Sequence, residues 1–242
     1  MAKTSKSRVR KVTEEPTLTL SRNTLLMRAG MGLFVLFGLF LITRPSVMGN
    51  IEDRLRSSTA NMNTHDGITK GDTRLSGIFM PEVLYWREDI LRWAAERSLN
   101  PNLIATIMQI ESCGDPYISS GAGAQGLFQV MPLHFGNGEN QIDIETNAIR
   151  GLNHLQDCLE WTDYDLGVTF ACYNAGPSVI GLPQSEWYQE SRNYYTWGMG
   201  IYREATSGTD SSSTLQTWLS AGGSGLCDSA RRTQQVFTPR EN

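Results

Sequence analysis

Several features that point to other classes of protein are scarce or missing in this chain of 242 residues. The formal net charge is −4, so the chain lacks the basic excess typical of nucleic-acid-binding proteins. Its four cysteines include no Cys-x-x-Cys pair, and His134 and His154 do not have the spacing of metal ligands. We therefore expect no nucleic-acid partner, no metal and no cofactor.

Alternation of apolar and polar residues, which would indicate β-strands, is not convincing anywhere, and no internal repeat occurs. Apolar residues recur instead at helical spacing. This spacing predicts helices over 83–99, 101–111, 146–161, 165–175 and 190–205, with a short helix near 129–135. The expected fold class is therefore mainly α.

A glycine-rich run begins at Gly121 and continues through Gly123 and Gly126. No Gly-Lys-Ser/Thr follows it and no hydrophobic strand precedes it, which excludes a phosphate loop and a dinucleotide fingerprint. Glycines in such a run let the backbone approach a neighbouring segment or a ligand closely. The run predicts a tight turn, or a turn that lines a binding site.

Glu111 stands at the end of the apolar helix expected over 101–111. Asn100 suits the N-cap and Pro101 the first helical position, while the glycine and proline of residues 113–116 stop the helix. Burial disfavours a charged carboxylate, and the C-terminus of a helix carries partial negative charge. Both effects raise the pKa of Glu111, as a general acid working near neutral pH requires.

Four ordered blocks of sequence surround this carboxylate: Ile110-Glu111-Ser112-Cys113-Gly114-Asp115-Pro116, the run from Gly121 to Pro132, Ala171-Cys172-Tyr173-Asn174-Ala175-Gly176-Pro177, and Glu190-Ser191-Arg192-Asn193-Tyr194. Together they resemble the lytic transglycosylase domain of the soluble-lytic-transglycosylase type, a relative of goose-type lysozyme, over residues 90–195. The resemblance implies a lysozyme-like helical domain with a substrate cleft. It also implies an enzyme that cleaves the glycan strands of bacterial peptidoglycan.

The resemblance also assigns roles to individual residues. Glu111 is the expected catalytic residue, Tyr173 is expected to hydrogen-bond its carboxyl group, and Asn174 to hold the substrate end of the cleft. The full set of expected substrate-binding or supporting residues is Ser112, Ser120, Gln129, Met131, Tyr173, Asn174, Glu190 and Tyr194. For Met131, packing in the core is the alternative.

The chain departs from the family pattern at a few positions. Cys113 stands where glycine is usual, and His154 where tyrosine is usual. We treat His134 and His154 as structural or solvent-facing. The residues that carry the site, among them Glu111 and Gln129, are unaffected.

Most glycoside hydrolases use two carboxylates, and here only Glu111 is convincing, because Asp115 more simply caps a loop. A single acid suffices when the substrate assists. The family logic is that Glu111 protonates the glycosidic oxygen and then accepts the proton of the 6-hydroxyl group, which leaves a 1,6-anhydromuramyl end. A hydrolytic muramidase and a catalytically silent peptidoglycan-binding module are the alternatives.

The N-terminal region has a basic front followed by an apolar segment over 25–43. Its length falls in the range of about 17–25 residues that spans a bilayer, and the basic residues in front place the N-terminus in the cytoplasm. We expect a basic cytoplasmic tail (1–24), a transmembrane signal anchor (25–43), a polar stalk (44–79), an extracytoplasmic lytic transglycosylase domain (80–205) and a Ser/Thr/Gly-rich tail (206–242). A cleaved signal peptide followed by secretion is the alternative.

All four cysteines follow the apolar segment, and an even number in an exported region suggests disulfides. The candidates are Cys113, Cys158, Cys172 and Cys227. Three pairings are possible, and the sequence does not choose between them. A bridge at Cys113 would brace the loop after the Glu111 helix, whereas buried free thiols are the alternative.

Overall fold

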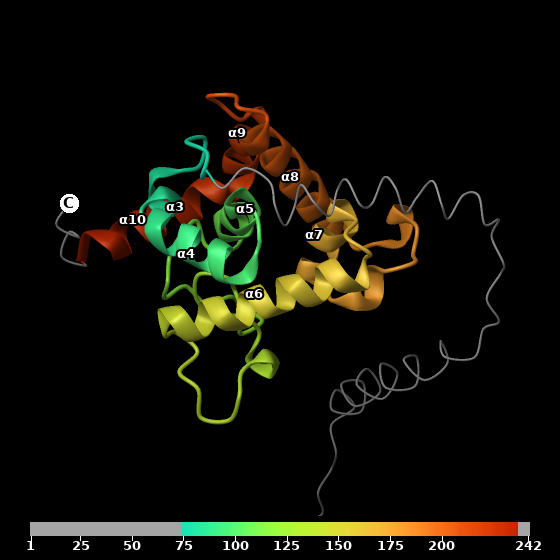
Figure 1. The fold of residues 1–242 in the computed structure, drawn as a ribbon, viewed down its shortest axis with the longest axis horizontal. Coiled ribbons are helices and arrows are strands. Elements are labelled where there is room, and N and C mark those ends of the chain that lie inside the picture. Colours follow the sequence, from blue (N-terminus) through green and yellow to red (C-terminus); the bar gives the residue numbers. More distant parts are fainter. Residues whose placement is uncertain (1–73, 237–242) are drawn as a thin grey trace, which may run out of the picture. The chain divides into compact units, whose positions relative to one another are not determined.

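The computed structural model describes residues 74–236, which form a helical domain without a β-strand in that range (Figure 1). This confirms the expected mainly α fold class for the part of the chain that is described. The helices are α3 (Pro81–Leu84), α4 (Arg87–Arg97), α5 (Pro101–Glu111), α6 (Ile144–Trp161), α7 (Leu166–Ala175), α8 (Gln189–Thr206), α9 (Ser213–Trp218) and α10 (Ser224–Val236). Shorter turns are η2 (Pro132–His134), η3 (Pro177–Val179), η4 (Gln184–Glu186) and the π-helical η5 (Leu219–Gly223).

Helix α5 is the core element that carries Glu111. Its N-cap forms as predicted, because the Asn100 side chain accepts a hydrogen bond from the backbone N–H of Asn102 and Pro101 occupies the first position. All of its residues from Pro101 to Ile110 are buried, and the helix packs against α4 and α8 (Figure 1). Burying each large aliphatic side chain contributes about 1.5–3 kcal/mol, so the position of the last turn is well determined.

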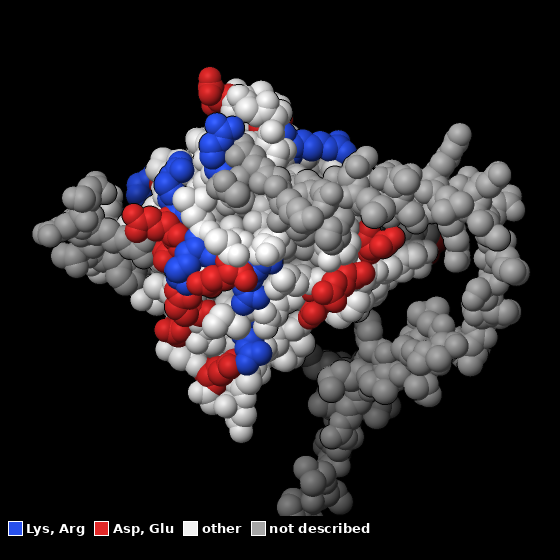
Figure 2. Space-filling model, in the orientation of Figure 1, with Lys and Arg blue, Asp and Glu red and all other residues white. Residues whose placement is uncertain are grey.

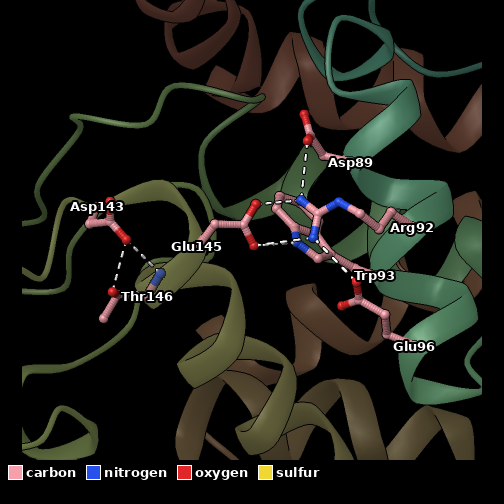
Figure 3. A network of polar contacts seen from close by, with 7 residues as sticks. All are labelled: Asp89, Arg92, Trp93, Glu96, Asp143, Glu145 and Thr146. Atoms are coloured by element: carbon pink, nitrogen blue, oxygen red, sulfur yellow. Dashed lines mark hydrogen bonds and ion pairs between the residues drawn. The ribbon is translucent and has the colours of Figure 1, made fainter.

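The start of α6 is tied to α4 by a polar network (Figure 3). Asp143 caps α6 by accepting from the backbone N–H of Thr146 at 2.9 Å. Two residues on, Glu145 pairs with Arg92 and accepts from the indole N–H of Trp93 at 3.1 Å. Arg92 and Glu145 are exposed, so the ion pair adds little stability, and its main effect is to fix the direction of α6.

The folded unit begins before the expected boundary at residue 80. Leu75, Ile78 and Phe79 are buried in the core, although we assigned 44–79 to a polar stalk. The backbone N–H of Ser76 donates to Asn102 Oδ1 at 2.8 Å, which holds this segment against α5. Three apolar side chains within a polar stretch were too weak a pattern to indicate packing.

The segment assigned to a C-terminal tail is folded through Val236. Leu215 and Trp218 of α9 are buried, as is Cys227 of α10. Glu204 of α8 organises the connection, because its carboxylate accepts from the hydroxyl groups of Ser212, Ser213 and Thr214. The serine and threonine residues of this segment thus supply hydrogen-bond donors to one carboxylate.

Two disulfides join the cysteines, Cys113 to Cys227 and Cys158 to Cys172, and no cysteine is free. The first bridge fastens α10 to the loop that follows Glu111, as predicted for a bridge at Cys113. Further contacts run beside it: Gln234 Nε2 donates to the Gly114 carbonyl at 3.1 Å, and Ser229 Oγ donates to Asp115 Oδ2 at 2.8 Å. Helix α10 therefore acts as a strap behind the end of α5.

The predicted basic tail and signal anchor, residues 1–24 and 25–43, lie outside the described residues. Among the helices of residues 74–236, none combines the length and the apolar character needed to span a bilayer. On the face drawn in Figure 2, acidic and basic side chains are interspersed and do not gather by sign.

Candidate active site

Glu111 ends helix α5 at the edge of a cleft of about 200 Å³. Its carboxylate oxygen Oε1 accepts a hydrogen bond of 2.8 Å from the hydroxyl group of Tyr194, which comes from α8. Seven of the nine predicted site residues line this cleft: Glu111, Ser120, Gln129, Met131, Tyr173, Asn174 and Glu190. Residues from four separate parts of the sequence thus meet around one carboxyl group.

The protein raises the pKa of Glu111 to about 8. Burial is the main cause, because a desolvated carboxylate is disfavoured, and the negative charge of Glu190 adds to the effect. The hydrogen bond from Tyr194 acts in the opposite direction, since it stabilises the charged form. At neutral pH Glu111 is therefore mostly protonated, which is the state a general acid needs.

The tyrosine that contacts Glu111 is not the one we expected. Tyr194 makes the hydrogen bond, whereas the hydroxyl group of Tyr173 donates to the backbone carbonyl of Phe128 at 2.9 Å. Burial and the charge of Glu111 raise the pKa of both phenols well above the usual value. Both hydroxyl groups therefore stay protonated and act as donors, Tyr194 to the carboxyl group and Tyr173 to the glycine-rich turn.

The glycine-rich turn forms one wall of the cleft and is held by Asn147 of α6. The Asn147 side chain accepts from the Phe128 N–H at 3.0 Å and donates to the Gln125 carbonyl at 2.8 Å. Gly126 has φ +72°, and a Cβ there would lie 2.7 Å from the Asn147 amide, so only glycine fits. Asn147 was missed from the sequence, because a single asparagine within a helical pattern gives no signal.

Gln129 lines the cleft but directs its amide N–H groups into the turn. Its side chain donates to the carbonyls of Ile118 and Gly126 at 3.0 and 3.1 Å, and its own φ is +45°. These bonds hold a residue in a left-handed conformation that non-glycine residues rarely adopt. The amide N–H groups thus brace the turn and do not point to a ligand.

Ser112 does not line the cleft, although we expected it among the substrate-binding or supporting residues. It is buried, donates to the Leu127 carbonyl at 2.7 Å and accepts from the Gly114 N–H at 3.0 Å. Ser112 therefore connects the end of α5 to the glycine-rich turn. Asn174 does line the cleft, and its Oδ1 accepts from Ser191 Oγ at 3.1 Å.

Comparison with known proteins identifies the segment that holds this site. Residues 88–196 match the family model of the transglycosylase SLT domain. Residues 88–196 are therefore an SLT domain. A protein of Enterobacteria phage PRD1 named transglycosylase is 31% identical over 117 residues, which is 48% of this chain and 42% of the phage protein. The chain thus matches less than half of that relative's length, and the strap helix α10 lies beyond the matched SLT domain.

Two histidines that we treated as structural or solvent-facing, His134 and His154, line the cleft. The rings of His134 and His154 lie 4.6 Å apart, and the His154 ring lies 5.1 Å from the ring of Tyr173. A signal was present in the sequence, since His154 occupies a position where the family usually has tyrosine.

Among the described residues that line the cleft, Glu190 is the one carboxylate besides Glu111, and its negative charge raises the pKa of Glu111. Asp115 is buried away from it and accepts from the Tyr117 N–H and from Ser229 and Thr233. Asp115 therefore caps the loop, as predicted.

One group of potential metal ligands occurs within residues 74–236: Glu82, Cys113 and Cys227. The two sulfur atoms are joined in a disulfide and cannot act as thiolate ligands. Glu82 pairs with Arg231 of the strap helix at 2.7 Å. The chemistry of this group does not suit a metal ion.

Proposed function

We propose that this protein is a peptidoglycan lytic transglycosylase that cleaves the bond between N-acetylmuramic acid and N-acetylglucosamine without water. One observation carries the proposal. A single buried carboxyl group, protonated at neutral pH and held by a tyrosine, stands at the edge of a cleft in an SLT domain. Such a group is suited to protonating a leaving glycosidic oxygen.

In the proposed reaction Glu111 acts first as acid and then as base. Protonated Glu111 gives its proton to the glycosidic oxygen while the bond from that oxygen to C1 of the muramyl sugar breaks. The acetamido oxygen of the same sugar stabilises the positive charge that develops at C1. The Glu111 carboxylate then removes the proton of the 6-hydroxyl group, whose oxygen bonds to C1. The product is a 1,6-anhydromuramyl end, and Glu111 is again protonated.

The surroundings of Glu111 support a mechanism with one enzyme carboxylate. Tyr194 donates to the carboxylate form, so it stabilises the charge that exists between the two proton transfers. Burial favours the neutral form, so it drives proton uptake in the second transfer. The two influences keep both forms of Glu111 accessible, as a residue that alternates between acid and base requires.

We also propose that residues 25–43 anchor the protein in a membrane, with the catalytic domain on the extracytoplasmic side. The two disulfides support an oxidising compartment. Extraction of a chain with Met1 intact that depends on detergent is the expected result. A secreted form that begins at Asn50 would refute the anchor in favour of a cleaved signal peptide.

The test of the enzymatic proposal compares the wild type, Glu111→Gln and the control Glu160→Gln, which changes an exposed glutamate on α6. Purified peptidoglycan is digested and the soluble products are identified by mass spectrometry. We expect anhydro ends from the wild type and the control, and no release by Glu111→Gln. Reducing ends would indicate a muramidase. Binding of the wall without release of fragments by the wild type would indicate a silent binding module.

A further inference from the structure

A row of rings runs along the cleft from η2 to Glu111. The His134 ring lies against the His154 ring of α6, His154 lies against Tyr173 of α7, and Tyr173 is stacked 6.4 Å from Tyr194 of α8, which reaches Glu111. Both tyrosines have roles in the site as described. The two histidines at the far end of the row have no role in the proposed proton transfers.

Within residues 74–236, the histidines are the only side chains lining the cleft that are able to carry positive charge. The acids that line it are Glu111 and Glu190, and no lysine or arginine is among its lining residues. Among the described residues that line the cleft, an anionic substituent of a bound glycan therefore has one place where it finds a group that can take up a proton. That place is the wall formed by His134 and His154.

His154 also has a ring nitrogen without a partner. Its Nε2 lies 3.2 Å from the carbonyl oxygen of Tyr173, and because a carbonyl oxygen only accepts, Nε2 carries the hydrogen. Nδ1 is buried and has no hydrogen-bond partner. Buried polar atoms are nearly always paired, so an unpaired one beside a cleft points to a bond completed by a proton or a ligand.

The groups around the pair decide when it is charged. Burial lowers the pKa of both histidines, and the proximity of His134 lowers that of His154 further. Asp157, one turn along α6 from His154, raises both pKa values, as does the Tyr173 carbonyl for His154. In the empty cleft the pair is therefore mostly neutral at neutral pH, and a bound anion would shift it toward the charged form.

We propose that His134 and His154 bind a carboxylate of the muramyl substituent in the glycan strand. This deepens the proposed function and rests on it. Two sources of that carboxylate occur in peptidoglycan: the lactyl group itself in strands that have lost their stem peptides, and the acidic residues of the peptide where it is present. In either case binding takes up a proton, so the affinity for the carboxylate increases as the pH falls.

The test measures binding by calorimetry in a Glu111→Gln background, which prevents turnover and removes the titration of Glu111. Three ligands of equal sugar number are compared at pH 5.5 and 7.5. These are a chitooligosaccharide, which lacks the lactyl group, a peptide-free GlcNAc–MurNAc oligosaccharide, and the same oligosaccharide bearing stem peptides. Each is also measured with His134→Gln and with His154→Gln added.

We expect binding of at least one carboxylate-bearing ligand to tighten by about tenfold at the lower pH, which corresponds to about 1.4 kcal/mol. The histidine variants should lose this gain while binding the chitooligosaccharide as before. An effect confined to the peptide-free ligand identifies the lactyl carboxylate, and one confined to the peptide-bearing ligand identifies the peptide.

Equal losses for all three ligands, or no loss for any, would overturn the proposal. Because His154 packs against Tyr173, the half-buried His134 provides the variant that perturbs the fold least. Failure of the catalytic proposal is read separately, from the products that the wild-type enzyme releases, and does not affect these binding measurements.

Discussion

The hydroxyl group of Tyr194 lies 2.8 Å from Oε1 of Glu111 and donates a hydrogen bond to it. The two residues are 83 positions apart in the sequence and come from helices α8 and α5, which pack against each other. The bond lowers the pKa of a carboxyl group that burial otherwise raises. The packing of these two helices therefore sets the protonation state of the proposed acid.

Replacing Tyr194 with phenylalanine should move the alkaline limb of the activity profile to higher pH. The hydrogen bond favours the charged form of Glu111, so its loss raises the pKa from about 8. Activity that needs protonated Glu111 then persists to higher pH, while the maximal rate falls because the carboxylate intermediate loses its donor. The rate of release of soluble fragments from peptidoglycan, measured between pH 5 and 10, checks both effects.

Tyr173→Phe is the matched control for that experiment. Its hydroxyl group donates to the Phe128 carbonyl and not to Glu111, so the alkaline limb should stay in place. The variant should instead lose about 1–3 kcal/mol of unfolding free energy, because a buried carbonyl is left without a partner. A shift of the limb in Tyr173→Phe as large as that in Tyr194→Phe would contradict the assignment of roles.

Glu190→Gln should move the same limb in the opposite direction. The charge of Glu190 raises the pKa of Glu111, and removing it makes the Glu111 carboxylate easier to form. The loss of activity on the alkaline side should therefore begin at lower pH than in the wild type. High salt should reduce the difference between the two proteins, since Glu190 is exposed and its charge is screened.

The position of Glu111 was predictable because its signals are local. Asn100, Pro101 and the apolar run define the helix, and Gly114 and Pro116 follow its end. The hydrogen-bond partner was not predictable in the same way. Tyr173 and Tyr194 both reach the site from packed helices, and which of two phenols meets the carboxyl group depends on the tertiary arrangement of α7 and α8.

The disulfide pairing and the extent of the domain also depended on tertiary structure. Pairing Cys113 with Cys227 requires α10 to return to the end of α5 after the Ser/Thr/Gly-rich segment that we expected to form a tail. The burial of Leu75 could not be inferred either, because its few apolar neighbours give no clear period. Local patterns predicted the helices and the acid, and long-range packing decided the rest.

The buried carboxyl group should make the protein less stable as the pH rises. Because the pKa of Glu111 is about 8 in the folded protein and 4.5 ordinarily, the folded state holds a proton that the unfolded state has released. The free energy of unfolding therefore keeps its full value below pH 4.5, the ordinary pKa of the carboxyl group. It decreases as the pH rises through the folded-state pKa of about 8, by at most about 1.4 kcal/mol per pH unit. Urea unfolding at pH 5 and 8 should show a decrease for the wild type that is clearly smaller for Glu111→Gln.

The two disulfides should differ in how much they stabilise the fold. Cys113 and Cys227 are 114 residues apart, and Cys158 and Cys172 are 14 apart. The chain-entropy model gives about 4.7 kcal/mol for a loop of about 100 residues and about 3 kcal/mol for one of about 15 residues. Replacing both cysteines of the longer loop with alanine should therefore lower the unfolding free energy more, as measured by urea denaturation of both double variants.

The backbone at Cys113 provides a sharper version of this experiment. Cys113 has φ +51°, a left-handed conformation that costs a residue with a Cβ about 1–2 kcal/mol, and glycine nothing comparable. With Cys227→Ala as the common background, Cys113→Gly should be more stable than Cys113→Ala by about 1 kcal/mol, even though glycine is usually the less stabilising residue. If alanine proved the more stable choice, the left-handed conformation would be a consequence of the disulfide and not a requirement of the loop after Glu111.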